Sequence, residues 1–187
     1  MITLELLEKE CGETVRDWTF RTILHNLVNL VLPPGSAVSE NDVASSLGIS
    51  RTPVRETFIR LAQDGLLDVY PQKGTYVSLV DEQRVEEGRY MRLCLETHTM
   101  ELACEVRSSE DLVALEANLQ RQRLAVNERN PSRFFSLDED FHRLVFVTCG
   151  KERIWEAIRK MSSHFDRVRM LSLHATNWDK IIAQHRF

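Results

Sequence analysis

Residues 39–67 read SENDVASSLGISRTPVRETFIRLAQDGLL, and they contain two successive helix-start signals. The first signal is Ser39 with acidic residues behind it, because a serine oxygen accepts a free backbone N–H and acids suit the positive end of a helix. This signal predicts a short helix over residues 40–47. Gly48 closes the helix.

The second helix-start signal is Ser50, which precedes Pro53 in the first helical turn, where a missing N–H is not needed. It predicts a helix over residues 51–64 that Gly65 ends. The connection Leu-Gly-Ile-Ser between the two helices has the short, glycine-containing form found in a helix-turn-helix. The quoted stretch therefore predicts that motif.

A β-hairpin is predicted next, in residues 66–80, which read LLDVYPQKGTYVSLV. Apolar residues flank the turn-forming sequence Pro-Gln-Lys-Gly at 71–74. Lys73 gives the hairpin a basic tip. Upstream, an apolar rhythm that starts at Trp18 predicts a helix that ends near Leu32, before two prolines and a glycine.

The second half of the chain shows only amphipathic helical patterns. The predicted helices cover residues 82–106, 109–127, 131–148, 151–174 and 177–187, with Ser109, Gly150 and Thr176 between them. The last pattern has no stop signal before Phe187, so we expect one or two closing helices beyond it. The fold class is mainly α, with a winged helix-turn-helix DNA-binding domain at 1–80 and an all-helical ligand-binding and dimerisation domain at 81–187.

The composition is that of an ordinary globular protein, because 43% of the 187 residues are hydrophobic and 28% are charged. No run approaches the roughly 20 apolar residues of a membrane span, and the first residues lack the order of a signal peptide. We therefore expect a cytoplasmic protein. The four cysteines form no CxxC pair and lie among apolar helical residues, which predicts reduced, buried thiols.

The charge of the chain gives no general attraction to DNA. The net charge is −4, and residues 1–80 hold more acids than bases, so DNA affinity has to come from a local cluster. The helix predicted at 51–64 offers such a cluster. The residues on its anchoring face are apolar: Val54, Phe58, Leu61 and Ala62. The residues on its free face or flank are donors: Arg51, Thr52 and Arg55.

These donors match the chemistry of DNA. An arginine fork satisfies guanine O6 and N7 together, whereas Ser50, Thr52 and backbone N–H groups at a helix start suit phosphate oxygens. Gln72 and Lys73 at the hairpin tip would follow the DNA backbone or enter the minor groove. Taken alone, two exposed arginines are more often solvated charges. The ordered set of cap, turn, arginine-bearing helix and basic hairpin favours DNA binding.

The same segment resembles the winged helix of GntR-family bacterial regulators over about residues 16–80, most specifically in SRTPVRE. The resemblance implies that Arg51, Thr52 and Arg55 contact operator DNA and that Gly74 shapes the wing. The helical half, with RYMRLCLETHTMELAC and LDEDFHRLVFVTCG, resembles the FCD effector domain of the FadR subfamily up to the end of the chain.

That subfamily resemblance implies a metal, often zinc or nickel, held by an aspartate and three histidines. Carried over residue by residue, the ligands present are Asp138, His142 and His185, and the i, i+4 spacing places the first two on one helix face. The final family histidine falls on a later helix that this chain does not contain, so water or effector oxygens would complete the coordination sphere. Without the resemblance, an Asp and His pair at this spacing is more often a helix-surface interaction.

Arg92 matches a family arginine at the mouth of the cavity, where it would hold the carboxylate of a small effector. A salt bridge to Glu96, four residues on, explains Arg92 equally well. The remaining histidines are expected to be ordinary solvent or core residues: His25, His98, His164 and His174.

The expected function is that of a homodimeric transcriptional regulator, not an enzyme. It would repress from a pseudo-palindromic operator and release that operator when a small carboxylate effector binds. The alternative is a metal sensor, in which the ion itself is the signal. A metal-dependent enzyme built on Asp138, His142 and His185 is disfavoured, because the sequence has no HExxH motif, no nucleophile context and no glycine-rich phosphate loop.

Overall fold

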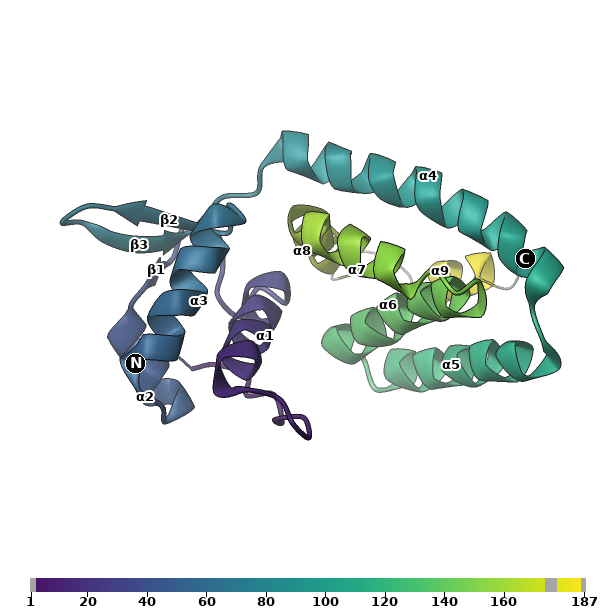
Figure 1. Ribbon diagram of the computed structural model, residues 1–187, viewed down its shortest axis with the longest axis horizontal. Helices are drawn as coiled ribbons and strands as arrows, with labels where there is room; N and C mark the ends of the chain where they lie inside the picture. Colours follow the sequence, from purple (N-terminus) through teal and green to yellow (C-terminus); the bar gives the residue numbers. More distant parts are fainter. Residues whose placement is uncertain (1–2, 174–177, 186–187) are drawn as a thin grey trace. The chain divides into compact units, whose positions relative to one another are not determined.

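The structure is a computed structural model that describes residues 3–173 and 178–185. The chain divides into two compact units, Met1–Asp81 and Glu82–Phe187. The first unit holds three helices and a small sheet with a hairpin, and the described part of the second unit holds helices alone (Figure 1). Within the described ranges, none of the helices is long and apolar enough to cross a membrane.

The first unit combines three helices with a small antiparallel sheet. Its elements are α1 (Val15–Val28), β1 (Ala37–Val38), α2 (Glu40–Leu47), α3 (Arg51–Gln63), β2 (Leu67–Tyr70) and β3 (Gly74–Val77). The strand order is β1-β3-β2, which places β3 at the centre. The predicted hairpin is β2 with β3. Strand β1, which pairs Ala37 with Tyr76, was not predicted, because two residues are too few to show a strand pattern.

The predicted helix-turn-helix is present as α2 and α3. Ser39 caps α2 by accepting the backbone N–H groups of Asn41 and Asp42, and Gly48 ends it with a φ of 66°. Ser50 occupies the N-cap position of α3, but its side chain makes no capping hydrogen bond with the described residues. Its hydroxyl is thus not used to start the helix.

The core of the first unit forms where α1, α2, α3 and the sheet meet. Its buried members include Ile23, Leu27, Val43, Val54, Phe58, Leu61, Leu66 and Val77. The prediction that one face of α3 anchors the helix through Val54, Phe58 and Leu61 is therefore confirmed.

Helix α1 ends earlier than the sequence predicts. It stops at Val28 instead of Leu32, because Leu30 adopts the left-handed conformation with a φ of 61°. The chain then turns back, and the N–H of Leu32 donates to the carbonyl of Asn26. The apolar rhythm continued into this turn, so periodicity alone did not mark the end.

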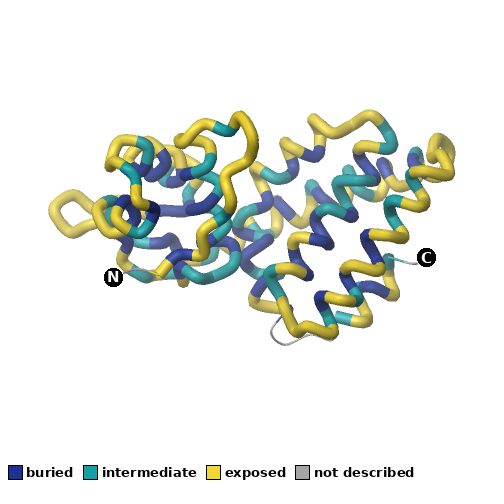
Figure 2. The backbone as a smooth tube through the Cα atoms, turned by 90° about the horizontal axis from the view of Figure 1, so that it is seen from below, coloured by how far each residue is buried: buried dark blue, intermediate teal, exposed yellow. Residues whose placement is uncertain are grey.

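The second unit is all helical. Its elements are α4 (Glu82–Val106), α5 (Ser109–Asn127), α6 (Pro131–Thr148), α7 (Glu152–Met161), α8 (Ser163–Leu173) and α9 (Trp178–Gln184). Helix α5 packs along α6, and α4 packs on both α6 and α8. Buried residues line the sides on which these helices face one another (Figure 2). The bounds of α4, α5 and α6 are those predicted.

The prediction of a single helix over residues 151–174 is wrong, because the chain forms two helices there. The break lies at Ser162, whose hydroxyl donates back to the carbonyl of Ile158 at 2.8 Å. The N-cap of α5 is Ser108, in a capping box with Asp111, and not Ser109. Two residues singled out from the sequence, His174 and Thr176, lie outside the described residues.

The prediction of buried cysteines is wrong. Cys11, Cys94 and Cys104 are exposed, and Cys149 is half-buried with its thiol 3.4 Å from the carbonyl oxygen of Thr99. The apolar neighbours in the sequence misled the prediction, because a helix presents successive residues to different faces. All four thiols are free in the described part of the chain.

Candidate functional site

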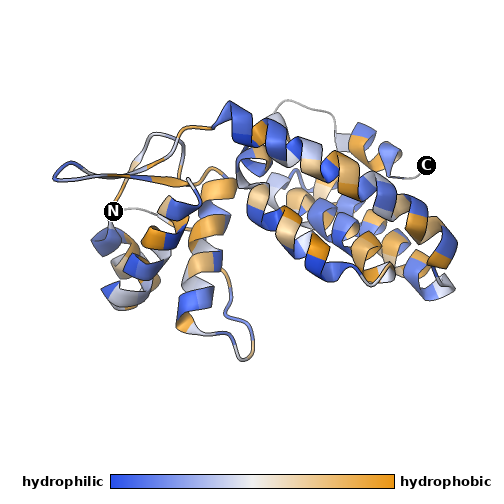
Figure 3. Cartoon of the chain, turned by 45° about the horizontal axis from the view of Figure 1, so that its top comes forward, coloured by the Kyte–Doolittle hydropathy of each residue, from blue (hydrophilic) through white to orange (hydrophobic). Residues whose placement is uncertain are grey.

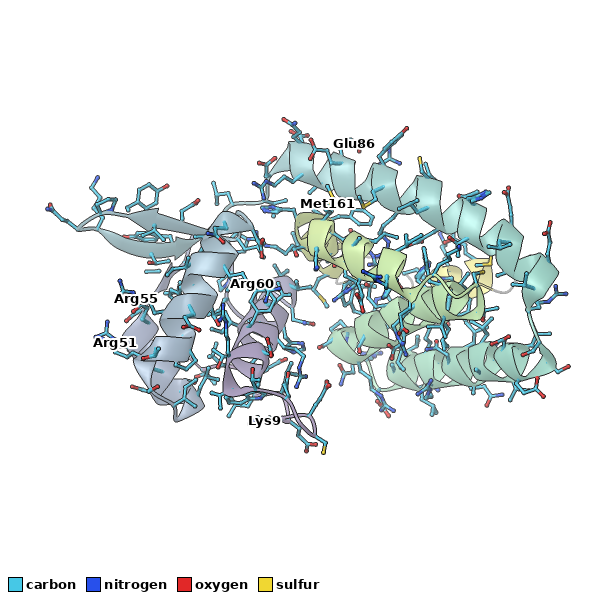
Figure 4. All side chains as sticks on the ribbon, viewed as in Figure 1. Lys9, Arg51, Arg55, Arg60, Glu86 and Met161 are labelled. Atoms are coloured by element: carbon cyan, nitrogen blue, oxygen red, sulfur yellow. The ribbon has the colours of Figure 1, made fainter. Side chains whose placement is uncertain are left out.

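The first candidate surface is the outward face of α3. Arg51, Thr52 and Arg55 are exposed there, while Val54 and Phe58 are buried on the opposite face. Arg51 and Arg55 project from the same side of the helix (Figure 4). The predicted donors therefore share one solvent-facing surface at the start of α3.

Arg51 has a partner that DNA would displace at small cost. Its Nη2 lies 3.3 Å from Oε2 of Glu40, and the Arg51 side chain is 65% exposed. Exposed ion pairs of this kind contribute little to stability. Glu40 was explained from the sequence by helix capping alone, so this contact was missed.

Arg60 is a basic residue of α3 that does not belong to this surface. Its guanidinium carbon lies 3.5 Å from the centre of the Phe20 ring, a cation–π contact with α1. In Figure 4 it lies on the α1 side of the helix, away from Arg51 and Arg55. The donor surface is thus confined to the first turns of α3.

The tip of the hairpin is the second candidate contact. Gln72 and Gly74 have positive φ values of 62° and 117°, which turn the chain sharply between β2 and β3. Gln72, Lys73 and Gly74 are all exposed, and the tip is hydrophilic (Figures 2 and 3). An edge contact between the rings of Tyr70 and Tyr76, with centroids 5.8 Å apart, braces the strands behind it.

The second unit brings together Asp138, His142 and His185. Each offers one ligand atom, and these atoms all lie within 4.8 Å of one another. Asp138 and His142 come from α6, and His185 follows α9. The His185 ring stacks on Phe141 with centroids 4.4 Å apart, which orients it toward the carboxylate. Nε2 of His185 lies 3.4 Å from Oδ1 of Asp138.

Glu96 of α4 orients the second histidine. Its Oε2 lies 3.1 Å from Nδ1 of His142, while Nε2 of His142 lies 3.9 Å from Oδ2 of Asp138. Burial raises the pKa of Glu96, but His142 and Arg92 outweigh burial and leave that pKa below its usual value. An ionised Glu96 that accepts the Nδ1 proton would leave Nε2 of His142 available to a cation.

The three residues fit a divalent metal ion. Oδ1 of Asp138 and Nδ1 of His185 are buried and have no hydrogen-bond partner among the described residues. Burial lowers the pKa of His185 to about 4, against the opposing effect of Asp138, so its imidazole is neutral at neutral pH. One carboxylate and two imidazoles form a donor set that suits zinc or nickel.

These three residues lie in the wall of a cavity of about 550 Å³ within the helical unit. Helices α4, α6, α8 and α9 all contribute to its lining. Arg92, which the sequence places at the cavity mouth, is one of the lining residues. Its guanidinium donates to Glu96 and to Glu139, each at 2.6 Å, so the anticipated pair with Glu96 is present.

A buried network of charges supports the cavity. Arg169 of α8 pairs with Asp138, Glu139 and Asp166, while Arg159 of α7 pairs with Glu139 and Asp166. Burial raises the pKa of Glu139, but the surrounding arginines hold it well below its usual value. Burial, together with Glu139, raises the pKa of Asp166 to about 6.

The sequence gives no sign of this network apart from Arg92 and Glu96. Only those two show a sequence signal, since they are four residues apart on one helix. Glu139 and Arg169 are separated by 30 residues, so nothing local marks them as partners.

The other described histidines take no part in the cluster of Asp138, His142 and His185. His25 pairs with Glu5 at 3.0 Å, and His98 is exposed beside Glu101. His164 is buried on α8.

The chain matches two protein-family models. The model described as bacterial regulatory proteins of the gntR family matches residues 19–77, and the FCD domain model matches residues 89–186. The HTH-type transcriptional repressor RspR of Escherichia coli strain K12 is 31% identical over 174 residues, which cover 92% of this chain and 76% of that protein. An HTH-type transcriptional regulator of Streptomyces ambofaciens is 36% identical over 176 residues, covering 94% and 74%.

Solved structures share the fold. The E. coli McbR/YncC structure has a TM-score of 0.79 at 22% identity and covers 93% of this chain and 82% of that one. A putative GntR regulator from Rhodococcus sp. RHA1 has a TM-score of 0.71 at 18% identity, covering 91% and 82%. With the helix-turn-helix, the hairpin and the helical unit in place, the chain belongs to the GntR family of bacterial DNA-binding transcriptional regulators and carries an FCD domain; it is not an enzyme.

Proposed function

We propose that this regulator is a cytoplasmic, homodimeric repressor whose operator affinity falls when a small carboxylate effector binds in its FCD domain beside a divalent metal ion. One observation carries the proposal. Asp138, His142 and His185 lie in the wall of a cavity large enough for an organic acid, and Asp138 and His185 each have a buried polar atom without a hydrogen-bond partner among the described residues. The donor surface of α3 belongs to the other compact unit.

The DNA-binding domain covers residues 1–80 in this proposal. Arg51 and Arg55 read base edges, and Thr52 and Ser50 bind phosphate oxygens near the start of α3. Ser50 suits this role because its hydroxyl makes no capping hydrogen bond with the described residues. The hairpin contacts that complete the surface are Gln72, Lys73 and Gly74.

The ligand-binding and dimerisation domain covers residues 81–187. Asp138 and His142 would hold a zinc or nickel ion together with His185, and the ion would supply an open coordination position for an effector oxygen. Arg92 would add positive charge to the same cavity. The buried arginine and carboxylate network fixes the helices that carry these residues.

Homodimerisation follows from the geometry of DNA recognition. A twofold dimer presents two α3 helices to the two halves of a pseudo-palindromic operator. An effector changes operator affinity only if it binds the DNA-bound and free conformations differently. We propose that effector binding relieves repression. The name of the similar RspR, a repressor, agrees with it.

Selection from a random duplex library tests the DNA-reading role. The full chain should enrich a twofold sequence, and Arg55→Ala should weaken discrimination at one base position per half-site by about 1–3 kcal/mol. Arg16→Ala is the matched control, because Arg16 is also exposed, at 66%, and paired with a glutamate. Unchanged sequence preference in Arg55→Ala would remove Arg55 from base recognition.

A metal-responsive sensor is the second candidate function. It is favoured by the close approach of the three donor residues, whose ligand atoms all lie within 4.8 Å of one another. Titration of zinc or nickel against operator affinity separates the candidates. A change with metal alone supports the sensor, whereas a change that needs an organic acid at saturating metal supports the effector-controlled repressor.

A further inference from the structure

The FCD cavity is lined by both polar and apolar side chains. The polar lining residues include Asp138, His142, His185 and Glu96. The apolar lining residues include Phe134, Phe135, Phe165, Val168, Leu173 and Ile181. A ligand that contacts both kinds of residue needs a polar end and an apolar body.

Two arginines of the cavity, Arg92 and Arg169, are already paired with acids. The Arg92 side chain is 6% exposed, with Nε 2.6 Å from Glu96 and Nη1 2.6 Å from Glu139. Arg169 is bound by Asp138, Glu139 and Asp166. Taking either guanidinium for a ligand would leave buried carboxylates unpaired, which is strongly unfavourable.

Arg89 is different. It lines the same cavity from α4, and its guanidinium pairs with Glu86 on the preceding helical turn. The side chains of the pair are 50% and 61% exposed, so water solvates Glu86 when Arg89 leaves it. Arg89 can therefore turn to a ligand carboxylate without leaving a buried charge behind.

We propose that the effector is a monocarboxylate with an apolar body, whose charge is read by Arg89 and whose body packs on Phe134, Phe135 and Phe165. The inference rests on the proposed function and names its effector class. A dicarboxylate whose body packs on Phe134, Phe135 and Phe165 fits poorly, because its second charge would be buried among apolar side chains without a partner. A cavity of about 550 Å³ leaves room for a body of several carbons.

Calorimetric titration of the zinc-loaded full chain tests the inference with defined probes. Butyrate and hexanoate form a series of increasing apolar length, succinate adds a second charge, and hexanamide removes the charge. Affinity should rise about fourfold for each added methylene, since each buried methylene is worth a near-constant transfer free energy. Succinate should bind at least about tenfold more weakly than butyrate, which has the same number of carbons, and hexanamide at least about tenfold more weakly than hexanoate.

The residue assignment is tested with Arg89→Gln. This variant should lose about tenfold or more of its hexanoate affinity and bind hexanamide as the parent does, because only the charge-assisted contact is removed. Arg143→Gln is the matched control: Arg143 is 42% exposed, pairs with an exposed glutamate and is outside the cavity lining. It should bind hexanoate unchanged.

The outcomes separate the inference from the proposed function. Succinate binding as tightly as butyrate, or full hexanoate affinity in Arg89→Gln, overturns the inference, while any acid that still shifts operator affinity leaves the proposed function standing. If no acid binds and none alters operator affinity, both are overturned.

Discussion

Glu96 acts through His142, the histidine that its carboxylate contacts. It contacts Nδ1 of His142 at 3.1 Å and is itself held by Arg92 at 2.6 Å. A carboxylate behind a ligand histidine fixes both the ring orientation and the nitrogen that carries the proton. Glu96 is thus a positioning residue for the proposed metal ion.

Replacing that carboxylate gives the first prediction. Glu96→Gln should weaken zinc affinity by about 10–100-fold, as loss of such outer contacts commonly does. Competition against a chromogenic chelator measures it. Glu101→Gln is the control on the same helix, since the Glu101 side chain is 72% exposed and pairs with His98. Equal zinc affinity in both variants would contradict the role of Glu96.

Asp166 gives a prediction about pH. Its pKa is raised from 3.8 to about 6, chiefly by burial, so between these values the folded chain keeps a proton that the unfolded chain has lost. This contribution to the free energy of unfolding is present below about pH 4 and is lost as pH rises through about 6. Urea unfolding followed by tryptophan fluorescence should show it as a difference from Asp166→Asn. A stability difference between the two proteins that stays constant from about pH 4 to 7 would contradict it.

Individual site residues differed in how far the sequence could reveal them. Asp138 and His142 are one helical turn apart, so their shared face followed from spacing. Arg92 and Glu96 were visible for the same reason. The partners supplied by other helices, such as Glu139 and Arg169, depend on tertiary packing that no local pattern encodes. His185 was suggested only by family resemblance.

At the scale of elements, the turn between α2 and α3 depends on Gly48. Its φ is 66°, and an added Cβ would meet nothing within 4 Å, so only backbone strain opposes a side chain there. Gly48→Ala should therefore lower the free energy of unfolding by about 1–2 kcal/mol. Thermal unfolding measures this loss.

Gly48→Asn is the matched variant for this turn, because asparagine tolerates the left-handed conformation better than alanine. It should recover part of the stability lost in Gly48→Ala. Equal stability of the alanine and glycine proteins would show that the turn does not require glycine.

Elements with a cap at one end and a glycine at the other were predicted well. Helix α2 runs between Ser39 and Gly48 as expected, and the hairpin formed around its glycine turn. Elements that lack such signals at their ends were predicted less well. The end of α1 lies inside an apolar pattern where Leu30 turns left-handed, and the break at Ser162 has no glycine or proline to mark it.

At the scale of the whole molecule, the proposed function assigns DNA reading to one unit and ligand binding to the other. In the FCD unit, ion pairs that cross from α4 to α6 and from α6 to α8 hold the helices that carry Asp138 and His142, the proposed metal ligands. A ligand that moves one of these helices should move the others with it, because separating the paired charges costs free energy. Such linked helices provide the differential contacts that an effector needs.

Operator affinity with and without an effector tests the central claim most directly. Fluorescence anisotropy of the zinc-loaded full chain on its selected duplex should show a Kd that rises about 5–150-fold when a saturating acid from the hexanoate series is added. His142→Ala should bind the same duplex but lose this response. A Kd that stays the same with and without every acid tested, including succinate, would contradict the account.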